Sequence, residues 1–319
     1  MPAFEMGLGE LKEYKGTNPK PSDFDSYWDN GLNELKTFDW KVELIPSKFQ
    51  VNFADCFHLY FTGVKGARIH AKYLRPKAVT EPHPAIIEFH GYSVNSGDWS
   101  DKLNYVALGY SYVALDCRGQ GGLSEDVGGV KGNTLHGHII KGLDDKPEQL
   151  LYRQIFLDTA QLAKIIMSFP EVDEDRVGTR GASQGGALTV ACAALEPRIK
   201  KAAPVYPFLS DYKRVWDMDL AKNAYEGITE YFRRFDPRHE RENEVFEILG
   251  YIDIQNLASR IKADVLWGIG LMDTICPPST QFAAYNKLNA NKRMTMYYDY
   301  GHEHIPQLND EIFNFLCKL

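Results

Sequence analysis

The sequence predicts an α/β protein with a mostly parallel central sheet flanked by helices. One observation is a set of short apolar runs typical of strands buried on both faces, which begin at residues 85, 111, 201 and 264. Segments with helical spacing of apolar residues separate these runs, an alternation typical of parallel sheets. A length of 319 residues, with 44% hydrophobic and 25% charged residues, is ordinary for a globular chain with a large core.

The N-terminal part of the chain departs from this alternation. Residues 22–36 are expected to form a helix, because Ser22 and Asp25 match a capping box and apolar residues follow at helical spacing. Residues 40–76 alternate between apolar and polar side chains, with two glycines that mark turns. We therefore expect antiparallel strands before the parallel sheet begins.

From residue 84 onward, strand and helix patterns follow one another. The first of these helices is expected to end at Gly109, because a glycine often terminates a helix. The predicted strands are 85–92, 111–116, 176–181, 201–208, 264–273 and 293–301, and the predicted helices are 98–108, 147–168, 184–195 and 307–318.

Residues 209–258 interrupt the alternation between two predicted strands. The segment is rich in charged and aromatic residues and is too long for a plain loop in a compact domain. We expect a helical insertion that forms a cap over the sheet edge; the alternative is a surface excursion with no role at the site. The sequence contains no internal repeat or low-complexity linker, so residues 1–319 are expected to form a single domain.

Charge and cysteine content argue against several classes of protein. Lys and Arg number 36 against 43 Asp and Glu, a net charge of −7, whereas a nucleic-acid partner requires a basic face. No apolar run reaches the roughly 18–20 residues of a membrane helix, so we expect no membrane partner. The five cysteines are scattered and odd in number, as is typical of a reducing compartment. Since the first segment also lacks the features of a signal peptide, we expect a cytoplasmic protein.

The sequence Gly181-Ala182-Ser183-Gln184-Gly185 matches the G-x-S-x-G motif. This copy follows a predicted strand and begins a predicted helix, which is the setting that a serine nucleophile requires. The tight turn strains the serine backbone and projects its hydroxyl above the sheet, and the helix N-terminus adds positive potential where an oxyanion forms. Ser183 is therefore the candidate nucleophile; an ordinary glycine-rich turn is the alternative.

A serine hydroxyl needs a base and an acid, and in this setting the acid precedes the histidine along the chain. Asp273 ends the predicted strand 264–273, 90 residues after Ser183. His302 follows the next predicted strand, 29 residues after Asp273 and directly after a glycine. Asp273 is thus the candidate acid and His302 the candidate base. The alternatives are that Asp273 is only a turn residue and that His304 is the base.

Two backbone N–H groups are expected to bind the oxyanion. Gln184 supplies one because it follows the nucleophile, and Tyr92 supplies the other from the loop after the strand 85–92. His90 is expected to anchor this loop by hydrogen bonds, with simple packing as the alternative. Arg118, at the same sheet edge, is expected to pin neighbouring loops, with substrate contact as the alternative.

The sequence lacks the motifs of common metal and nucleotide sites. It contains no H-E-x-x-H, no C-x-x-C and no G-x-G-x-x-G. We therefore expect neither a metal nor an organic cofactor.

Five segments together resemble carbohydrate esterase family seven, the acetyl xylan esterases and cephalosporin C deacetylases. The likeness extends over nearly the whole chain, and the order RGQ, G-x-S-Q-G and HE is a specific combination. The segments are HGY at 90–92, RGQGG at 118–122, GASQGG at 181–186, GLMDTICPPSTQFAAYN at 270–286 and GHE at 301–303.

The resemblance implies an α/β-hydrolase fold, an intracellular location and a homohexamer whose active sites face an inner cavity. It places Ser183, Asp273 and His302 on the family's nucleophile, acid and base, and Tyr92 and Gln184 on its oxyanion donors. It also implies that acetyl groups are removed from short xylo-oligosaccharides and from cephalosporin C.

The residues and the resemblance together predict a serine esterase that works through an acetyl-enzyme intermediate. Small acetylated sugars or cephalosporin-type esters are the expected ligands. The alternatives are a general carboxylesterase, a peptidase of the same fold, and an inactive binding module. Peptidases of this fold usually carry a large β-propeller, which this chain has no residues to build, and an inactive module needs neither acid nor base.

Overall fold

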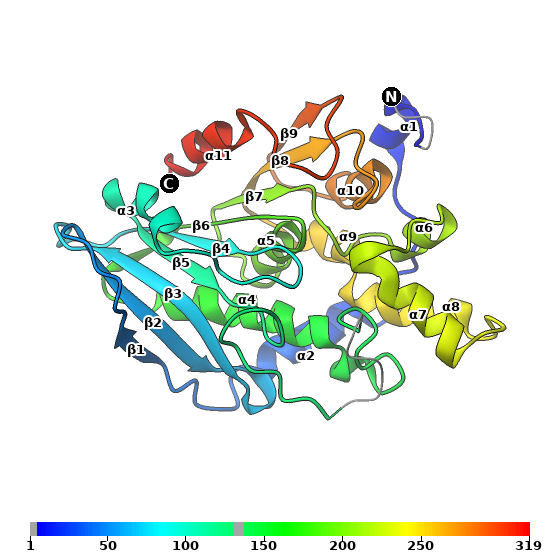
Figure 1. The fold of residues 1–319 in the computed structure, drawn as a ribbon, viewed down its shortest axis with the longest axis horizontal. Coiled ribbons are helices and arrows are strands. Elements are labelled where there is room, and N and C mark those ends of the chain that lie inside the picture. Colours follow the sequence, from blue (N-terminus) through cyan, green and yellow to red (C-terminus); the bar gives the residue numbers. More distant parts are fainter. Residues whose placement is uncertain (1–4, 130–136) are drawn as a thin grey trace.

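One nine-stranded sheet organises the residues that the structure, a computed structural model, describes: 5–129 and 137–319. Its strand order is β1-β2-β3-β5-β4-β6-β7-β8-β9 (Figure 1). The strands are β1 (Glu43–Pro46), β2 (Ala54–Thr62), β3 (Arg68–Pro76), β4 (His83–Phe89), β5 (Ser111–Leu115), β6 (Val172–Ala182), β7 (Lys201–Val205), β8 (Asp264–Gly270) and β9 (Lys292–Tyr297). The pairs β1–β2, β2–β3 and β3–β5 are antiparallel, and the five pairs from β5 to β9 are parallel. The predicted fold class is confirmed.

Helices cover both faces of this sheet (Figure 1). They are α1 (Leu8–Glu13), α2 (Phe24–Glu34), α3 (Leu103–Ala107), α4 (Leu151–Met167), α5 (Gln184–Leu195), α6 (Tyr212–Asp217), α7 (Glu226–Phe235), α8 (Glu242–Leu249), α9 (Ile254–Leu257), α10 (Pro278–Tyr285) and α11 (Leu308–Leu316). In the described part of the chain, none of them is both long and apolar enough to cross a lipid bilayer.

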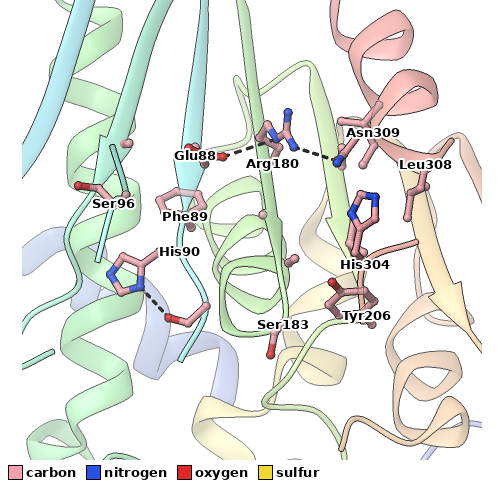
Figure 2. Close-up of a pocket in the computed structure, with 18 of the residues that line it drawn as sticks. Glu88, Phe89, His90, Ser96, Arg180, Ser183, Tyr206, His304, Leu308 and Asn309 are labelled. Carbon is pink, nitrogen blue, oxygen red and sulfur yellow. Dashed lines mark hydrogen bonds and ion pairs between the residues drawn. The ribbon is translucent and has the colours of Figure 1, made fainter. Parts of the chain in front are cut away.

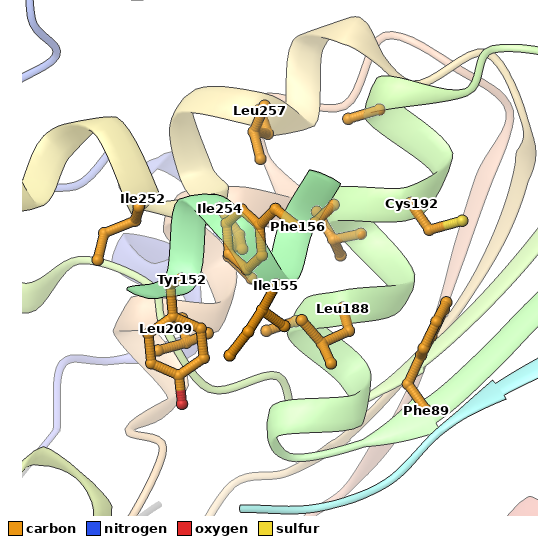
Figure 3. Close-up of a cluster of buried hydrophobic side chains, with 14 of the residues drawn as sticks. Phe89, Tyr152, Ile155, Phe156, Leu188, Cys192, Leu209, Ile252, Ile254 and Leu257 are labelled. Carbon is orange, nitrogen blue, oxygen red and sulfur yellow. The ribbon is translucent and has the colours of Figure 1, made fainter. Parts of the chain in front are cut away.

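Alternate residues of the central strands enter two separate cores, one on each face of the sheet. In β4, Ala85 and Ile87 join the core beneath α4 and α5, whereas Ile86 joins the core beneath α3 and α11. This is the period of two that a strand imposes. Figure 3 shows part of the first core, where Ile155 of α4 and Leu188 of α5 meet. Because helices cover both faces, every residue of β5 is buried, as its apolar sequence predicts.

The helix predicted over 22–36 forms as α2, but the capping box predicted for Ser22 and Asp25 does not. The N-cap residue is Asp23, and its side chain makes no capping hydrogen bond. The Asp23 carboxylate instead accepts a hydrogen bond from the Tyr251 hydroxyl. A contact with a distant part of the chain therefore replaces the local one.

Two helices, α1 and α10, were not predicted. The first has only six residues, of which Leu11 alone is buried, so its apolar pattern is weak. The second begins at Pro278. A proline in the first turn of a helix is a start signal, and this signal could have identified α10.

Residues 209–258, predicted as a helical insertion, contain α6 to α9, at the right of Figure 1. The segment also holds the N-terminal arm of the chain. The Asp211 carboxylate accepts hydrogen bonds from the Tyr14 hydroxyl at 2.8 Å and from the backbone N–H groups of Thr17 and Asn18 at 3.0 and 2.8 Å. One buried carboxylate thus joins two segments about 200 residues apart.

Candidate active site

Ser183 lies at the turn between β6 and α5, where the sequence predicts it. Its φ is 59° and its ψ is −118°, a backbone conformation that a residue other than glycine rarely adopts. A Cβ on Gly181 would lie 2.4 Å from the carbonyl oxygen of Gly185, and a Cβ on Gly185 would lie 2.0 Å from that of Phe89. Both flanking positions therefore need glycine, and the close backbone contacts hold the strained turn.

Two hydrogen bonds join Ser183, His302 and Asp273 in a chain. The Ser183 hydroxyl donates to Nε2 of His302 at 2.9 Å, and Nδ1–H of His302 donates to Asp273 Oδ2 at 2.8 Å. The tautomer follows from the carboxylate, which can only accept. His302, and not the exposed His304, makes both contacts. The structure therefore brings together the three residues that the sequence predicts.

Asp273 is fully buried, and both of its carboxylate oxygens have partners. Oδ1 accepts the backbone N–H groups of Ile275 and Cys276, each at 2.8 Å, while Oδ2 accepts from His302. The residue therefore shapes its own turn and also orients the imidazole, so it is more than a turn residue.

The thiol of Cys276 lies beside the same acid and imidazole. One potential ligand atom from each of Asp273, Cys276 and His302 lies within 4.8 Å of the others. Burial, and then the Asp273 carboxylate, raise the pKa of the Cys276 thiol well above its usual range, although the Ser183 side chain lowers it. The thiol is therefore neutral at neutral pH. Cys276 was not predicted as a site residue; its position three residues after Asp273 was the available signal.

The loop that carries Tyr92 and the turn before Gln184 leave the same edge of the sheet. Phe89 at the end of β4 pairs with Gly181 near the end of β6, and the two strands are parallel. Gln184 is the first residue of α5, where a backbone N–H has no acceptor within the helix. Gln184 thus directly follows Ser183 at the start of α5, and the loop that contains Tyr92 begins at the neighbouring strand end.

The structural roles predicted for His90 and Arg118 are confirmed. Nδ1–H of His90 donates to the Gly91 carbonyl at 2.7 Å, and its Nε2 accepts the Cys117 N–H at 3.0 Å. Burial lowers the pKa of His90, which keeps the ring neutral, as an acceptor nitrogen requires. Arg118 is 1% exposed and makes two hydrogen bonds to Asp158, at 2.7 and 2.6 Å, so it is not free to contact a substrate.

A cavity of about 440 Å³ opens beside Ser183 and His302 (Figure 2). Glu88 and Arg180 line it and lie 3.9 Å apart as an ion pair. Tyr206 also lines it, and its ring packs on that of His302 with centroids 4.6 Å apart. The cavity is therefore polar on the sheet side and aromatic next to the imidazole.

Tyr92 lies outside the lining of this cavity. Its ring packs against His138 and Phe208, with centroids 4.8 and 5.7 Å away, and burial raises its pKa to about 12. The Phe208 ring in turn contacts Tyr225 at 4.4 Å. Residues 209–258 therefore pack behind Phe208 and Tyr92, and none of them lines the cavity.

The profile of the acetyl xylan esterase (AXE1) family matches residues 1–319. The chain belongs to this family. The crystal structure of acetyl xylan esterase 1 from Thermoanaerobacterium sp. JW/SL YS485 is similar to this structure, with a TM-score of 0.97 over 98% of this chain and 99% of that one. The two sequences are 64% identical. The acetyl xylan esterase from Paenibacillus sp. R4 is 35% identical, with a TM-score of 0.93 over the same shares.

Acetyl esterase Axe7A of Xylanibacter ruminicola is 25% identical over 290 residues, which are 88% of this chain. The match spans 63% of the length of that relative. More distant solved structures share only the architecture, which is the α/β-hydrolase fold.

In this acetyl xylan esterase family member, the Gln184 side chain cross-links the loops around Ser183. It forms a paired amide contact with Gln120, in which Gln120 Nε2 donates at 2.8 Å and Gln184 Nε2 donates back at 3.0 Å. Its oxygen also accepts from the Tyr152 hydroxyl at 2.8 Å, and Gln120 accepts the Ser93 N–H at 2.8 Å. Only the backbone of Gln184 was predicted to have a role. The glutamines of the RGQ and G-x-S-Q-G segments were the available signal.

Proposed function

We propose that this protein is a serine esterase that removes acetyl groups from short acetylated xylo-oligosaccharides and from cephalosporin C. The observation that carries the proposal is the hydrogen-bonded chain from Ser183 through His302 to Asp273. It gives the hydroxyl a base within reach, and gives the base an acceptor that orients it. Membership of the acetyl xylan esterase family supports acetyl as the acyl group.

The proposed reaction is a double displacement. His302 takes the Ser183 proton while the serine oxygen attacks the acetyl carbonyl carbon, and it then gives that proton to the leaving sugar oxygen. Water next attacks the acetyl-serine with His302 again as the base, and acetate and free Ser183 result. Asp273 holds the ring tautomer and stabilises the imidazolium. These steps use only side chains and water, so we propose no metal or organic cofactor.

The backbone N–H groups of Tyr92 and Gln184 are the proposed oxyanion donors. The N-terminus of α5 adds positive potential at the same place. The amide pair between Gln184 and Gln120 supports this role, because it fixes the start of α5 against the loop that contains Ser93. Loss of one such donor typically lowers kcat by about 10²–10³.

Substitution of Ser183 tests the mechanism. Ser183→Ala should lower kcat on nitrophenyl acetate roughly 10⁴–10⁶-fold, because the base and oxyanion donors alone give little turnover. Circular dichroism and thermal unfolding should match those of the parent. Ser100→Ala, at an exposed serine outside the site, is the matched control and should keep full activity. If Ser183→Ala kept about a tenth of the parental activity, Ser183 would not be the nucleophile.

A substrate panel separates the proposed function from a general carboxylesterase and a peptidase. The panel contains acetylated xylo-oligosaccharides, cephalosporin C, a peptide amide, and one nitrophenol carried on acetate, propionate, butyrate and octanoate. Crowding by the aromatic ring of Tyr206, which lines the cavity, should disfavour long acyl groups, since overpacking costs about 1–3 kcal/mol. Because 1.4 kcal/mol is tenfold in rate, butyrate should fall at least about tenfold below acetate in kcat/KM. Equal rates for acetate and octanoate would favour a general carboxylesterase.

Three further proposals concern the whole chain. We propose that residues 1–319 form a single domain with 209–258 as a cap on the Tyr92 side, which the contact between Phe208 and Tyr225 supports. The family resemblance supports a homohexamer, and the scattered cysteines support a cytoplasmic location. Native mass spectrometry would test the hexamer against the 36.3 kDa of one chain.

A further inference from the structure

Three different metal-binding side chains meet behind the nucleophile. Potential ligand atoms of Asp273, Cys276 and His302 lie within 4.8 Å of one another. Asp273 and Cys276 both come from the loop after β8. The N–H of Cys276 donates to the Asp273 carboxylate and closes a short turn, which holds the two residues close together. The third arrives from the loop after β9. In the described part of the chain, no other group of three histidine, cysteine or acidic side chains has such a geometry.

The donor set suits a particular kind of ion. Sulfur, imidazole nitrogen and one carboxylate oxygen are the ligands that zinc uses, and a thiolate selects zinc and softer ions over Mg²⁺ or Ca²⁺. Metal–ligand distances of about 2.0–2.3 Å place neighbouring tetrahedral ligands about 3.3–3.7 Å apart. Side-chain shifts of about 1 Å would therefore bring the three atoms into coordination.

The burial of the three ligand residues and their access to the cavity also suit a bound metal ion. Asp273 and Cys276 are fully buried, so their side chains are shielded from water. The His302 side chain is 20% exposed and borders the cavity, which provides an entry path. The Ser183 hydroxyl lies 2.9 Å from His302 Nε2, next to one of the ligand residues.

We propose that Asp273, Cys276 and His302 form an inhibitory site for a soft or borderline divalent cation, such as Zn²⁺ or Cd²⁺. A metal–sulfur bond forms, the S–H bond breaks, and the thiol proton passes to solvent. The carboxylate and one imidazole nitrogen complete the protein ligands. Coordination through Nε2 displaces the hydrogen bond from Ser183, whereas coordination through Nδ1 requires the Nδ1 proton to move to Nε2 and displaces the hydrogen bond to Asp273. In both cases Nε2 no longer has a free lone pair, so the ring cannot take the Ser183 proton.

This inference goes beyond the proposed function, and it can be measured without an ester. The purified full-length chain is titrated with Cd²⁺ while the ultraviolet charge-transfer band of cadmium thiolate is followed. One equivalent should bind and produce the band. In parallel, Zn²⁺ should inhibit hydrolysis of nitrophenyl acetate, and EDTA should restore the activity.

Two cysteine-to-serine substitutions test which thiol binds the metal ion. Loss of an outer-shell partner alone lowers metal affinity by about 10–100-fold. Loss of the sulfur ligand in Cys276→Ser should therefore raise the Zn²⁺ concentration for half-inhibition at least about 100-fold, relative to that variant's own activity, and abolish the Cd²⁺ band. Cys317→Ser is the matched control, because this half-buried cysteine lies in the C-terminal segment, and it should behave like the parent.

Several outcomes would overturn the site. These are the lack of a Cd²⁺ band in the parent, its persistence in Cys276→Ser, and equal Zn²⁺ inhibition in both. Should Cys276→Ser fail to fold, Asp273→Asn keeps the thiol but removes the charged carboxylate ligand, so it should lower Cd²⁺ affinity at least about 10-fold. Unchanged affinity there would also contradict the proposal. A Ser183→Ala variant that stayed active would refute the proposed nucleophile but would leave Cd²⁺ binding unaffected, so the two failures can be told apart.

Discussion

The two ring nitrogens of His302 have different partners, and this difference determines what the residue can do. Nδ1 keeps its proton because it faces a carboxylate, which leaves the lone pair on Nε2 toward Ser183. The Tyr206 ring covers one side of the imidazole and restricts its rotation. The orientation of the base is thus fixed by three contacts from three different loops.

The pair His302 and His304 provides a matched test at the residue scale. His302→Ala should lower kcat roughly 10⁴–10⁶-fold, because both hydrogen bonds belong to this ring. His304→Ala, two positions away and exposed, should retain the parental kcat within about threefold. Steady-state kinetics on nitrophenyl acetate measure both. The opposite pattern would assign the base to His304.

At the scale of elements, the start of α5 is pressed against the end of β4. The carbonyl of Phe89 leaves no room for a side chain at position 185. Since both atoms in this contact would be fixed, neither a rotamer change nor a flexible side chain can relieve a clash. The position of Ser183 therefore depends on backbone packing between a helix and a strand.

Gly185→Ala should consequently destabilise the protein and impair the site together. A Cβ would lie 2.0 Å from the Phe89 carbonyl oxygen, so α5 or β4 must shift, at a cost of about 1–3 kcal/mol or more. Gly9→Ala in α1 is the control, because a Cβ there meets nothing within 4 Å, and alanine is better than glycine in a helix by about 1 kcal/mol. Thermal unfolding should show a lower Tm for Gly185→Ala only. An unchanged Tm and kcat in that variant would contradict this account.

The sequence predicts elements well where the apolar period is long and the element is central. The helix 184–195 and the strand 111–115 appear at the expected places, because their burial on the sheet agrees with their local pattern. The capping box predicted at the start of α2 was wrong, because the Asp23 side chain accepts a hydrogen bond from Tyr251 and does not cap the helix. No local pattern contains that partner.

The candidate site shows the same division. Ser183, Asp273 and His302 could be predicted because each follows a strand of a parallel sheet. The carboxyl ends of β6, β8 and β9 therefore lie at the same edge. Cys276 and the two glutamines stand next to predicted site residues in the sequence, but the contacts that their side chains make depend on how loops fold against one another, so these contacts could not be predicted.

At the scale of the whole molecule, Glu196 at the end of α5 connects α4 with the segment before β7 through ion pairs. It is 1% exposed and accepts from Lys164 of α4 and from Arg198. Burial alone would raise its pKa, but the hydrogen bonds from Arg198 and Lys164 outweigh burial and lower the pKa to about 2 from an ordinary 4.5. A depressed pKa means that the folded state favours the ionised form, so the carboxylate stabilises the fold above pH 4.5.

This contribution should be lost as the pH falls from about 4.5 through about 2. Glu196→Gln should lower the free energy of unfolding by up to about 3 kcal/mol at pH 6, and the gap to the parent should shrink below pH 4.5. Urea unfolding at pH 6 and pH 3 measures it. Glu174→Gln removes an exposed partner of the same Arg198 and should cost at most about 1 kcal/mol at either pH. A gap for Glu196→Gln that did not depend on pH would contradict the assignment.

The edge position of β9 has a consequence for inactivation. Among the residues that the structure describes, this strand pairs with β8 alone, and none of its own residues is fully buried, yet the loop after it supplies His302. Edge elements with few buried contacts open at a lower free energy than the centre of a sheet. Fraying of β9 would withdraw the imidazole while the central strands stay folded. Heating should therefore abolish the activity reversibly below the temperature at which the whole sheet unfolds. During synthesis, the chain should remain inactive until β9 has paired with β8.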